Sequence, residues 1–145
     1  MHMQPGRWLY GLIASVLCSI APTATAQIVV ARVSITDQEM MVYVDNALEH
    51  VWKVSTARRG YKTPPGSYTP YWLSKNHRSR KYDNAPMPYA VFFHGGYAVH
   101  GTTEIKRLGQ RASHGCVRLM TENARTLYTL VQQYGKQNVA IVILP

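Results

Sequence analysis

The chain has 145 residues, with 16 Lys and Arg against 7 Asp and Glu and a formal net charge of +9 at pH 7. This length predicts a single domain with one hydrophobic core. A basic chain first suggests a nucleic acid partner, but the export signal described next argues against it. An anionic envelope polymer or lipid headgroup is the better partner, and a merely soluble basic surface is the open alternative.

Residues 1–26 have the pattern of a secretion signal that is cleaved. Arg7 supplies the positive start, residues 9–20 are almost entirely apolar, and residues 24–26 read Ala-Thr-Ala, a small-x-small cleavage site. The apolar stretch is shorter than the roughly 20 residues of a membrane span. We therefore expect a mature domain at 27–145, located in the periplasm or cell envelope, without a stable membrane span. An uncleaved anchor is the alternative.

The first third of the mature chain predicts three strands. Residues 28–35, 40–44 and 48–54 are rich in β-branched and aromatic side chains. Asp37-Gln38 and Asp45-Asn46 are turn signals between them. Two consecutive hairpins at this spacing predict an antiparallel meander.

The next segment combines a rigid loop with a basic stretch. Residues 63–66, Thr-Pro-Pro-Gly, lack two N–H donors and permit a tight bend. Residues 67–73 predict a strand that Pro70 breaks. Residues 74–84 are polar and basic, which predicts a long surface loop. This loop could be a basic wall of a substrate cleft, although a solvated loop with scattered charge is the more common outcome.

A hairpin follows, with strands predicted at 88–93 and 97–101 around Gly95-Gly96. Side chains alternate along a strand, so His100 and Val99 are expected on opposite faces. His100 then lies near a strand end, where a rigid backbone can aim its ring into a cleft.

The remaining elements are a lid, a helix and a last strand. Residues 102–112 predict a flexible basic connection, long enough to act as a lid. Residues 121–135 carry one apolar stripe at helical spacing, with Thr121 as N-cap and Gly135 at the C-terminal end. Residues 138–144 predict a buried strand. The chain is therefore predicted to be a small, mainly β domain with one helix.

Cys116 is the only cysteine outside the leader. In an oxidising compartment an unpaired cysteine is either buried and inert or kept for its chemistry. A nucleophilic thiol needs a base, and His100 or His114 could serve; periodicity does not choose between them. Gly115 permits a sharp turn that brings N–H groups to a reacting carbonyl, and Arg118 is a fixed cation for a carboxylate. This cluster favours nucleophilic catalysis.

A zinc site is the main competing hypothesis, with Cys116, His94, His100 and His114 as ligands. The spacing does not resemble a C-x-x-C knuckle, and Glu104 is the only carboxylate nearby to act as a base on zinc-bound water. We therefore predict that no metal and no other cofactor takes part.

Residues 100–102, His-Gly-Thr, and 113–119, Ser-His-Gly-Cys-Val-Arg-Leu, resemble the signature of the L,D-transpeptidase catalytic domain, also called the YkuD domain. The similarity extends to residues 63–68 and 82–89 and covers nearly all of the mature chain. It implies a β-sandwich-like domain carrying one helix, which agrees with the elements above. It also implies a role in peptidoglycan biosynthesis, cell wall biogenesis and cell shape.

The resemblance implies that Cys116 is the nucleophile and His100 the general base, with the backbone around Gly101 orienting the imidazole. The thiol would attack the carbonyl of the diamino acid at position three of a tetrapeptide stem and release the terminal D-alanine. An amine of a neighbouring stem would resolve the thioester, giving a 3→3 cross-link. A free D-amino acid or a lysine of an outer-membrane lipoprotein are further acceptors that stay open.

The resemblance places the other site residues around this pair. His114 and Gly115 would line the oxyanion hole with the backbone of Cys116, while Ser113 orders the loop. Arg118 would hold a stem carboxylate, and Tyr89 would line the cleft. Two alternatives are a hydrolase on the same scaffold, acting as carboxypeptidase or endopeptidase, and a non-catalytic wall-binding module that keeps a buried thiol.

Overall fold

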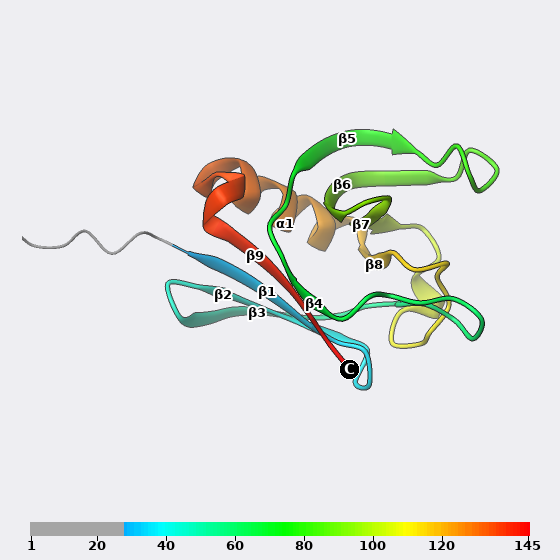
Figure 1. The fold of residues 1–145 in the computed structure, drawn as a ribbon, viewed down its shortest axis with the longest axis horizontal. Helices are drawn as coiled ribbons and strands as arrows, with labels where there is room; N and C mark the ends of the chain where they lie inside the picture. The colour runs from blue at the N-terminus through cyan, green and yellow to red at the C-terminus, as the bar shows by residue number, and fades with distance from the viewer. Residues whose placement is uncertain (1–27) are drawn as a thin grey trace, which may run out of the picture.

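Two β-sheets face each other across a shared core in the computed structural model, which describes residues 28–145 (Figure 1). The predicted secretion signal lies outside the described residues. The first sheet has the order β3 (Ala47–Lys53), β2 (Glu39–Val44), β1 (Val29–Ser34), β9 (Val139–Leu144), β4 (Gly66–Tyr68). The second has the order β5 (Trp72–Arg78), β6 (Pro86–His94), β7 (Tyr97–Thr102), β8 (Val117–Met120). The predicted fold class, mainly β with one helix, is confirmed.

The predicted meander is correct, since β1 pairs antiparallel with β2 and β2 with β3. Asp45 and Asn46 both have positive φ, as the turn between β2 and β3 requires. The pattern did not predict two parallel pairs, β1 with β9 and β7 with β8. Parallel neighbours need a long crossover, so their pairing is set by distant parts of the chain rather than by local turns.

The prediction of a surface loop over residues 74–84 is wrong in its first half. Strand β5 continues to Arg78, paired antiparallel with β6. It is an edge strand, whose outward positions can be polar. On the outer face of the sheet it is held by aromatic contacts, with His77 edge-on to Phe92 at 4.9 Å between ring centroids. The loop itself spans only 79–85.

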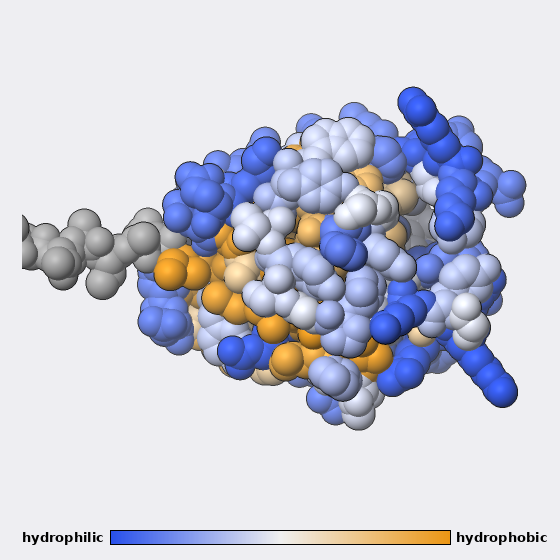
Figure 2. Space-filling model, viewed as in Figure 1, coloured by the Kyte–Doolittle hydropathy of each residue, from blue (hydrophilic) through white to orange (hydrophobic). Residues whose placement is uncertain are grey.

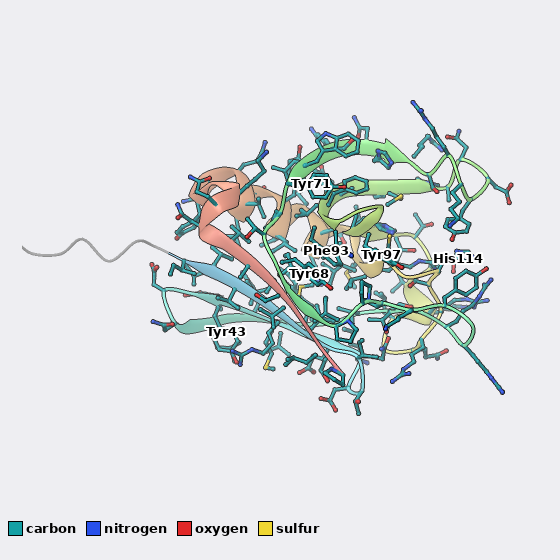
Figure 3. All side chains as sticks on the ribbon, in the orientation of Figure 1. Tyr43, Tyr68, Tyr71, Phe93, Tyr97 and His114 are labelled. Atoms are coloured by element: carbon teal, nitrogen blue, oxygen red, sulfur yellow. The ribbon has the colours of Figure 1, made fainter. Side chains whose placement is uncertain are left out.

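The chain passes from one sheet to the other at Pro70, where the sequence predicted a break. Strand β4 ends at Tyr68 in the first sheet, and β5 starts at Trp72 in the second. Tyr68 packs against Phe93 of β6 with ring centroids 5.2 Å apart, so an aromatic contact between the two sheets holds the start of this connection in place (Figure 3).

The predicted helix is confirmed as α1 (Thr121–Tyr134). The N-cap is Met120 rather than the predicted Thr121, whose hydroxyl donates to the Thr102 carbonyl at 3.4 Å. Gly135 ends the helix with φ +85° and donates its N–H to the Val131 carbonyl at 3.0 Å. No helix within residues 28–145 is both long and apolar enough to cross a membrane.

One core joins both sheets and the helix. Its largest fully buried side chains come from β1, β2, β6 to β9 and α1, and include Met40, Val42, Val91, Leu119, Leu127, Ile141 and Ile143. Figure 2 shows that hydrophobic side chains also reach the surface over the first sheet, while strongly hydrophilic ones gather at the opposite end of the molecule. The exposed apolar residues of the first sheet and its ends include Ile28, Leu48, Val51 and Leu144.

The predicted lid, residues 102–112, is tied to the body of the domain. It contains a short 3-10 helix, η1 (Ile105–Arg107), and a second one, η2 (Lys136–Asn138), precedes β9. The Gly109 N–H donates to the Val54 carbonyl at 2.8 Å, and the Ala112 N–H to the Thr56 carbonyl at 2.9 Å. The connection is therefore anchored along its second half.

Candidate active site

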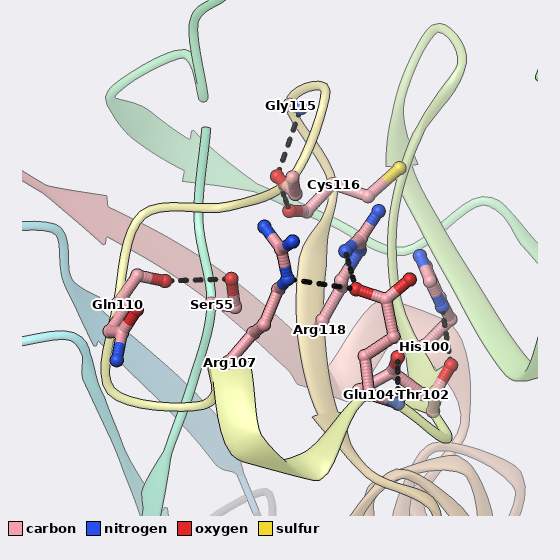
Figure 4. A network of polar contacts seen from close by, with 11 residues as sticks. Ser55, His100, Thr102, Glu104, Arg107, Gln110, Gly115, Cys116 and Arg118 are labelled. Carbon is pink, nitrogen blue, oxygen red and sulfur yellow. Dashed lines mark hydrogen bonds and ion pairs between the residues drawn. The ribbon is translucent and has the colours of Figure 1, made fainter. Parts of the chain in front are cut away.

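The only described thiol lies on the outer face of the second sheet, beside the end of β7. Strands β7 and β8 run parallel with Val99 opposite Val117 and His100 opposite Arg118. Both valines are buried in the core, so alternation turns His100, Cys116 and Arg118 to the other face. Cys116 packs there against a small apolar cluster of Met87, Ala90, Phe92 and Ala98. Figure 4 shows His100, Cys116 and Arg118 together, His100 on one strand and the other two on and just before the neighbouring strand.

The Cys116 thiol is protonated at rest. Burial raises its pKa, and the Ala98 N–H and Arg118 only partly offset this effect. The Ala98 N–H points at Sγ from 3.5 Å, and the Gly96 carbonyl lies 3.9 Å from it. Within residues 28–145 no hydrogen bond joins Sγ to a ring nitrogen of His100, and catalytic contacts are often loose without substrate.

His100 is held in the form that a general base needs. Its Nδ1 lies 2.7 Å from the Gly101 carbonyl oxygen. A carbonyl can only accept, so Nδ1 carries the proton and Nε2 keeps its lone pair. Burial lowers the pKa of His100 to about 4; the bond to Gly101 opposes this shift, and the Arg118 charge adds to it. The ring is therefore neutral at pH 7.

Two glycines, each next to one of these two residues in sequence, let other parts of the chain pack closely against the backbone. A Cβ on Gly101 would lie 2.9 Å from Thr121 Oγ1 and 3.0 Å from Pro88 Cγ. Gly115 has φ +136°, and a Cβ there would lie 2.6 Å from the Tyr97 ring. Neither site has room for a side chain, and the second also has a conformation that other residues rarely adopt.

Two hydroxyl groups lock the loop that carries the thiol. Ser113 Oγ donates to the Cys116 carbonyl at 2.6 Å and accepts from the Gly115 N–H at 3.0 Å. That N–H is therefore already engaged. Thr63 Oγ1 donates to the Gly115 carbonyl at 2.8 Å and accepts from the Ala57 N–H at 3.0 Å. Sequence reasoning missed Thr63 as a site residue, because its only signal was its place before two prolines.

His114 does not share the position of His100. Its ring stacks on Tyr82 with centroids 4.0 Å apart and meets Tyr61 edge-on at 4.8 Å. Burial, followed by the charges of Arg58, Arg118 and Lys81, lowers its pKa. The sequence left both histidines open as the base, and the geometry favours His100, which lies on the face of the thiol.

Arg118 is largely shielded, with its side chain 18% exposed. Its Nη1 lies 3.5 Å from Glu104 Oε2, and Arg107 Nε approaches the same oxygen at 3.5 Å (Figure 4). Glu104 is thus the carboxylate that contacts this guanidinium. The contacts are long enough to be exchanged for a bidentate one.

An aromatic shelf, formed by Trp72, His77 and Phe92, continues the apolar surface beside Cys116. Trp72 stacks on Phe92 at 4.6 Å, and His77 meets both rings edge-on. Phe92 also belongs to the cluster on which Cys116 packs. The sequence did not predict the shelf, because His77 lies in the stretch predicted to be a loop and Trp72 at the end of a predicted strand whose partner was not known.

The structure does not bring Tyr89 to the thiol. Its ring meets Tyr128 of α1 at 5.7 Å, on the helix side of the sheet. There it lines a shallow hollow together with Lys75 and Arg125. A larger hollow on the exposed side of α1 has neither a cysteine nor a histidine among its lining residues.

The ligands of the zinc hypothesis do not converge. Within the described part of the chain no three His, Cys, Asp or Glu side chains are placed to hold one metal ion. His94 instead lies between the rings of Tyr68 and Tyr97, with centroids 4.9 and 6.0 Å away.

Comparisons with known proteins identify the family of the chain. A family model for the L,D-transpeptidase catalytic domain (YkuD) matches residues 28–142. The protein YqjB of Bacillus subtilis (strain 168) is 26% identical over 106 residues, covering 64% of this chain and 60% of its own. An L,D-transpeptidase from Mycobacterium tuberculosis H37Rv superposes with a TM-score of 0.75 at 26% identity, covering 82% of this chain and 58% of the other. One from Stackebrandtia nassauensis gives 0.71 at 25%, covering 88% and 61%. The chain thus spans about three fifths of each of these proteins.

Proposed function

Because the chain belongs to the L,D-transpeptidase catalytic-domain (YkuD) family, we propose that it is a cysteine-dependent peptidoglycan L,D-transpeptidase. One observation carries the proposal. His100, with Nδ1 tied to the Gly101 carbonyl and a neutral ring, lies on the same sheet face as the thiol of Cys116. A base fixed in the correct tautomer beside a thiol is the arrangement that acyl transfer requires.

The reaction begins from two neutral groups. Sγ of Cys116 attacks the carbonyl of the third residue of a tetrapeptide stem, while its proton passes to Nε2 of His100. The tetrahedral oxyanion then collapses, the carbon–nitrogen bond to the terminal D-alanine breaks, and the proton moves from Nε2 to the leaving amine. A thioester remains on Cys116.

The second half reverses these proton movements. An acceptor amine attacks the thioester, gives its proton to His100 and forms the new amide, and the sulfur leaves and is reprotonated. Because the pKa of the thiol is raised and that of the imidazole lowered, no stable thiolate–imidazolium pair forms at rest. The proton therefore moves during attack, when the substrate excludes water.

Arg118 is proposed to bind a carboxylate of the stem. The long contact with Glu104 leaves the guanidinium able to exchange partners. The aromatic shelf beside Cys116 offers apolar surface to the aliphatic part of the stem. The leader supports a periplasmic or envelope location, and the acceptor is another stem, a free D-amino acid or a lipoprotein lysine.

Intact mass spectrometry tests the proposal. The mature protein and its Cys116→Ala variant are mixed with a tetrapeptide muropeptide, and the mass of the protein is followed with time. We expect an adduct on the wild type only, followed by cross-linked dimer. An adduct that decays to tripeptide alone would replace the transferase by the hydrolase. No adduct on either protein would refute catalysis and leave the wall-binding module.

A further inference from the structure

The positive charge of this protein is concentrated around its active site. Segments 58–62, 78–84 and 104–111, here called the cationic rim, carry three Lys or Arg residues each. Against these nine cations stand two carboxylates, Asp83 and Glu104. Among the other described residues, six cations face five carboxylates. Nearly all of the net charge therefore lies on these three segments.

The three segments meet at the loop that carries the thiol. Arg58 donates its N–H to the Ser113 carbonyl at 2.9 Å, and the second half of segment 104–111 is bound to the strand end at Val54. Tyr61 and Tyr82 come from the first and second segments, and both contact the His114 ring. The rim thus lies beside the loop that carries the thiol, at the hydrophilic end seen in Figure 2.

The rim cations are available to a partner. All nine are exposed. Within residues 28–145 only Arg107 of the nine has an ion pair, with Glu104. Arg58 and Lys81 lie over the rings of Tyr61 and Tyr82, at 5.0 and 5.5 Å from the centroids. Because these cations carry charge of one sign with few carboxylates near them, they attract anions and raise the local concentration of an anionic ligand.

We propose that the cationic rim binds the free carboxylates of neighbouring peptide stems on a peptidoglycan strand, holding the polymer across the thiol. This inference rests on the proposed function and adds a second binding surface for the same polymer, outside the pair of reacting residues. Each uncross-linked stem ends in a carboxylate, so a strand presents anions at intervals, as a ring of separate cations requires. An anionic membrane pressed onto the same ring would instead cover the thiol.

Sedimentation with insoluble peptidoglycan sacculi, stripped of proteins and other anionic polymers, tests the inference. All proteins carry Cys116→Ala, so that binding is measured without reaction. The rim variant changes one exposed cation per segment, Arg59→Glu, Arg80→Glu and Arg111→Glu. The control variant makes the same charge change elsewhere, with Arg32→Glu, Lys75→Glu and Arg125→Glu. Thermal unfolding verifies that both variants fold.

We expect the rim variant to bind sacculi about tenfold more weakly or worse at low salt, and the control variant to lose less than about threefold, because local charge dominates steering. Binding of the parent protein should fall at least about tenfold between 0.05 and 0.5 M salt. Sacculi whose carboxylates are converted to carboxamides should bind the parent as weakly as native sacculi bind the rim variant. This last arm needs no variant and remains decisive if the rim variant does not fold.

Equal losses in both variants, or unchanged binding to carboxamide sacculi, would overturn the inference. Tighter binding to anionic phospholipid vesicles than to sacculi would assign the rim to a membrane and overturn it as well. The thiol is absent here, so these results are independent of catalysis. An acyl adduct without rim-dependent binding would support the proposed function and overturn the inference about the rim. Rim-dependent binding without an acyl adduct would support the rim and overturn the proposed function.

Discussion

His100 combines two properties that are costly together, deep burial and a titratable ring. It is 6% exposed, and its pKa is lowered to about 4 from an ordinary value of 6.5. The folded protein therefore resists a proton that the unfolded chain accepts readily. A base that stays neutral at acid pH is useful in catalysis, but it makes the fold sensitive to acid.

We predict that His100 lowers the free energy of unfolding as the pH falls through the interval between these two pKa values, 6.5 and about 4. In that interval the unfolded state binds one proton more than the folded state. The loss of unfolding free energy therefore grows to about 3 kcal/mol as the pH falls to about 4, and it stays constant below that pH. Urea unfolding of the wild type and His100→Gln between pH 7 and 4 measures it. The variant should lack this part of the acid sensitivity, and parallel pH profiles would contradict the prediction.

Gly115 is a second residue of the site at which an added side chain would be strained. Gly115→Ala would place a Cβ 2.6 Å from the Tyr97 ring at φ +136°. We expect a loss of about 2–3 kcal/mol in unfolding free energy, because strain and overpacking act together. Acylation of Cys116 by a carbapenem should also slow by at least about tenfold if the thiol loop shifts by as little as 1 Å.

The matched control for this change is Gly96→Ala. Gly96 lies near the same thiol but has open space within 4 Å of an added Cβ. We expect it to unfold and to acylate almost as the wild type does. A similar loss in both variants would mean that the effect does not come from the close approach to Tyr97.

At the scale of elements, the active site depends on how loops are fastened to strands. The buried Thr63 hydroxyl links the Thr-Pro-Pro-Gly segment to the thiol loop by donating to the Gly115 carbonyl, and it also accepts a hydrogen bond from the Ala57 N–H. The bridge from Ala57 to Ser113 runs beside it. The loop that carries Cys116 is therefore stabilised by a segment fifty residues away in sequence.

We predict that Thr63→Val, which keeps the shape and removes the hydroxyl, destabilises the protein by about 2–4 kcal/mol because two buried backbone groups lose their partners. Carbapenem acylation should slow as well. Thr63→Ser keeps the hydroxyl and should restore most of both quantities. Chemical denaturation and the rate of carbapenem acylation measure these two quantities. A Ser variant as impaired as the Val variant would show that the loss does not come from the hydrogen bonds of the hydroxyl group.

Local pattern was sufficient for elements whose signals are local. The meander, the Gly-Gly hairpin and α1 follow from turn residues and apolar spacing. Strand β5 was missed because an edge strand with polar positions looks like a loop until its partner is known. Strand β8 was missed because its register with β7 depends on a crossover, which no short window contains.

The same division applies to the candidate site. The Ser-His-Gly-Cys-Val-Arg run indicated the thiol, its loop and Arg118. The choice between His100 and His114, the contribution of Thr63 and the aromatic shelf required three-dimensional proximity. Tyr89 illustrates the limit, since it follows a proline in a recognisable segment yet packs on the helix side.

At the scale of the whole molecule, one core holds both sheets and the helix together. Leu127 is fully buried in it, on the face of α1 that packs on the second sheet. A defect there should weaken both sheets at once, since they do not have separate cores. The thiol, on the outer face, is insulated from this core by β7 and β8.

We predict that Leu127→Ala lowers the free energy of unfolding by about 3 kcal/mol through the cavity that it leaves. Unfolding should remain a single transition by circular dichroism and by fluorescence. At temperatures where the variant stays folded, acylation of Cys116 should match the wild type. The exposed Thr129→Ala on the same helix is the control, and two separated transitions would show that the sheets fold independently.

The parallel pairing of β7 and β8 has a consequence for how this domain can be changed. The register of these two strands puts the proposed base, His100, and the proposed nucleophile, Cys116, on the same face of the sheet. The crossover between the strands runs through residues 103–116 and supplies one of the three segments of the cationic rim. A hairpin would tie loop length to register, but a crossover does not. Segment 104–108 is thus a natural grafting point, where designed insertions could retune polymer preference while the reacting atoms keep their positions.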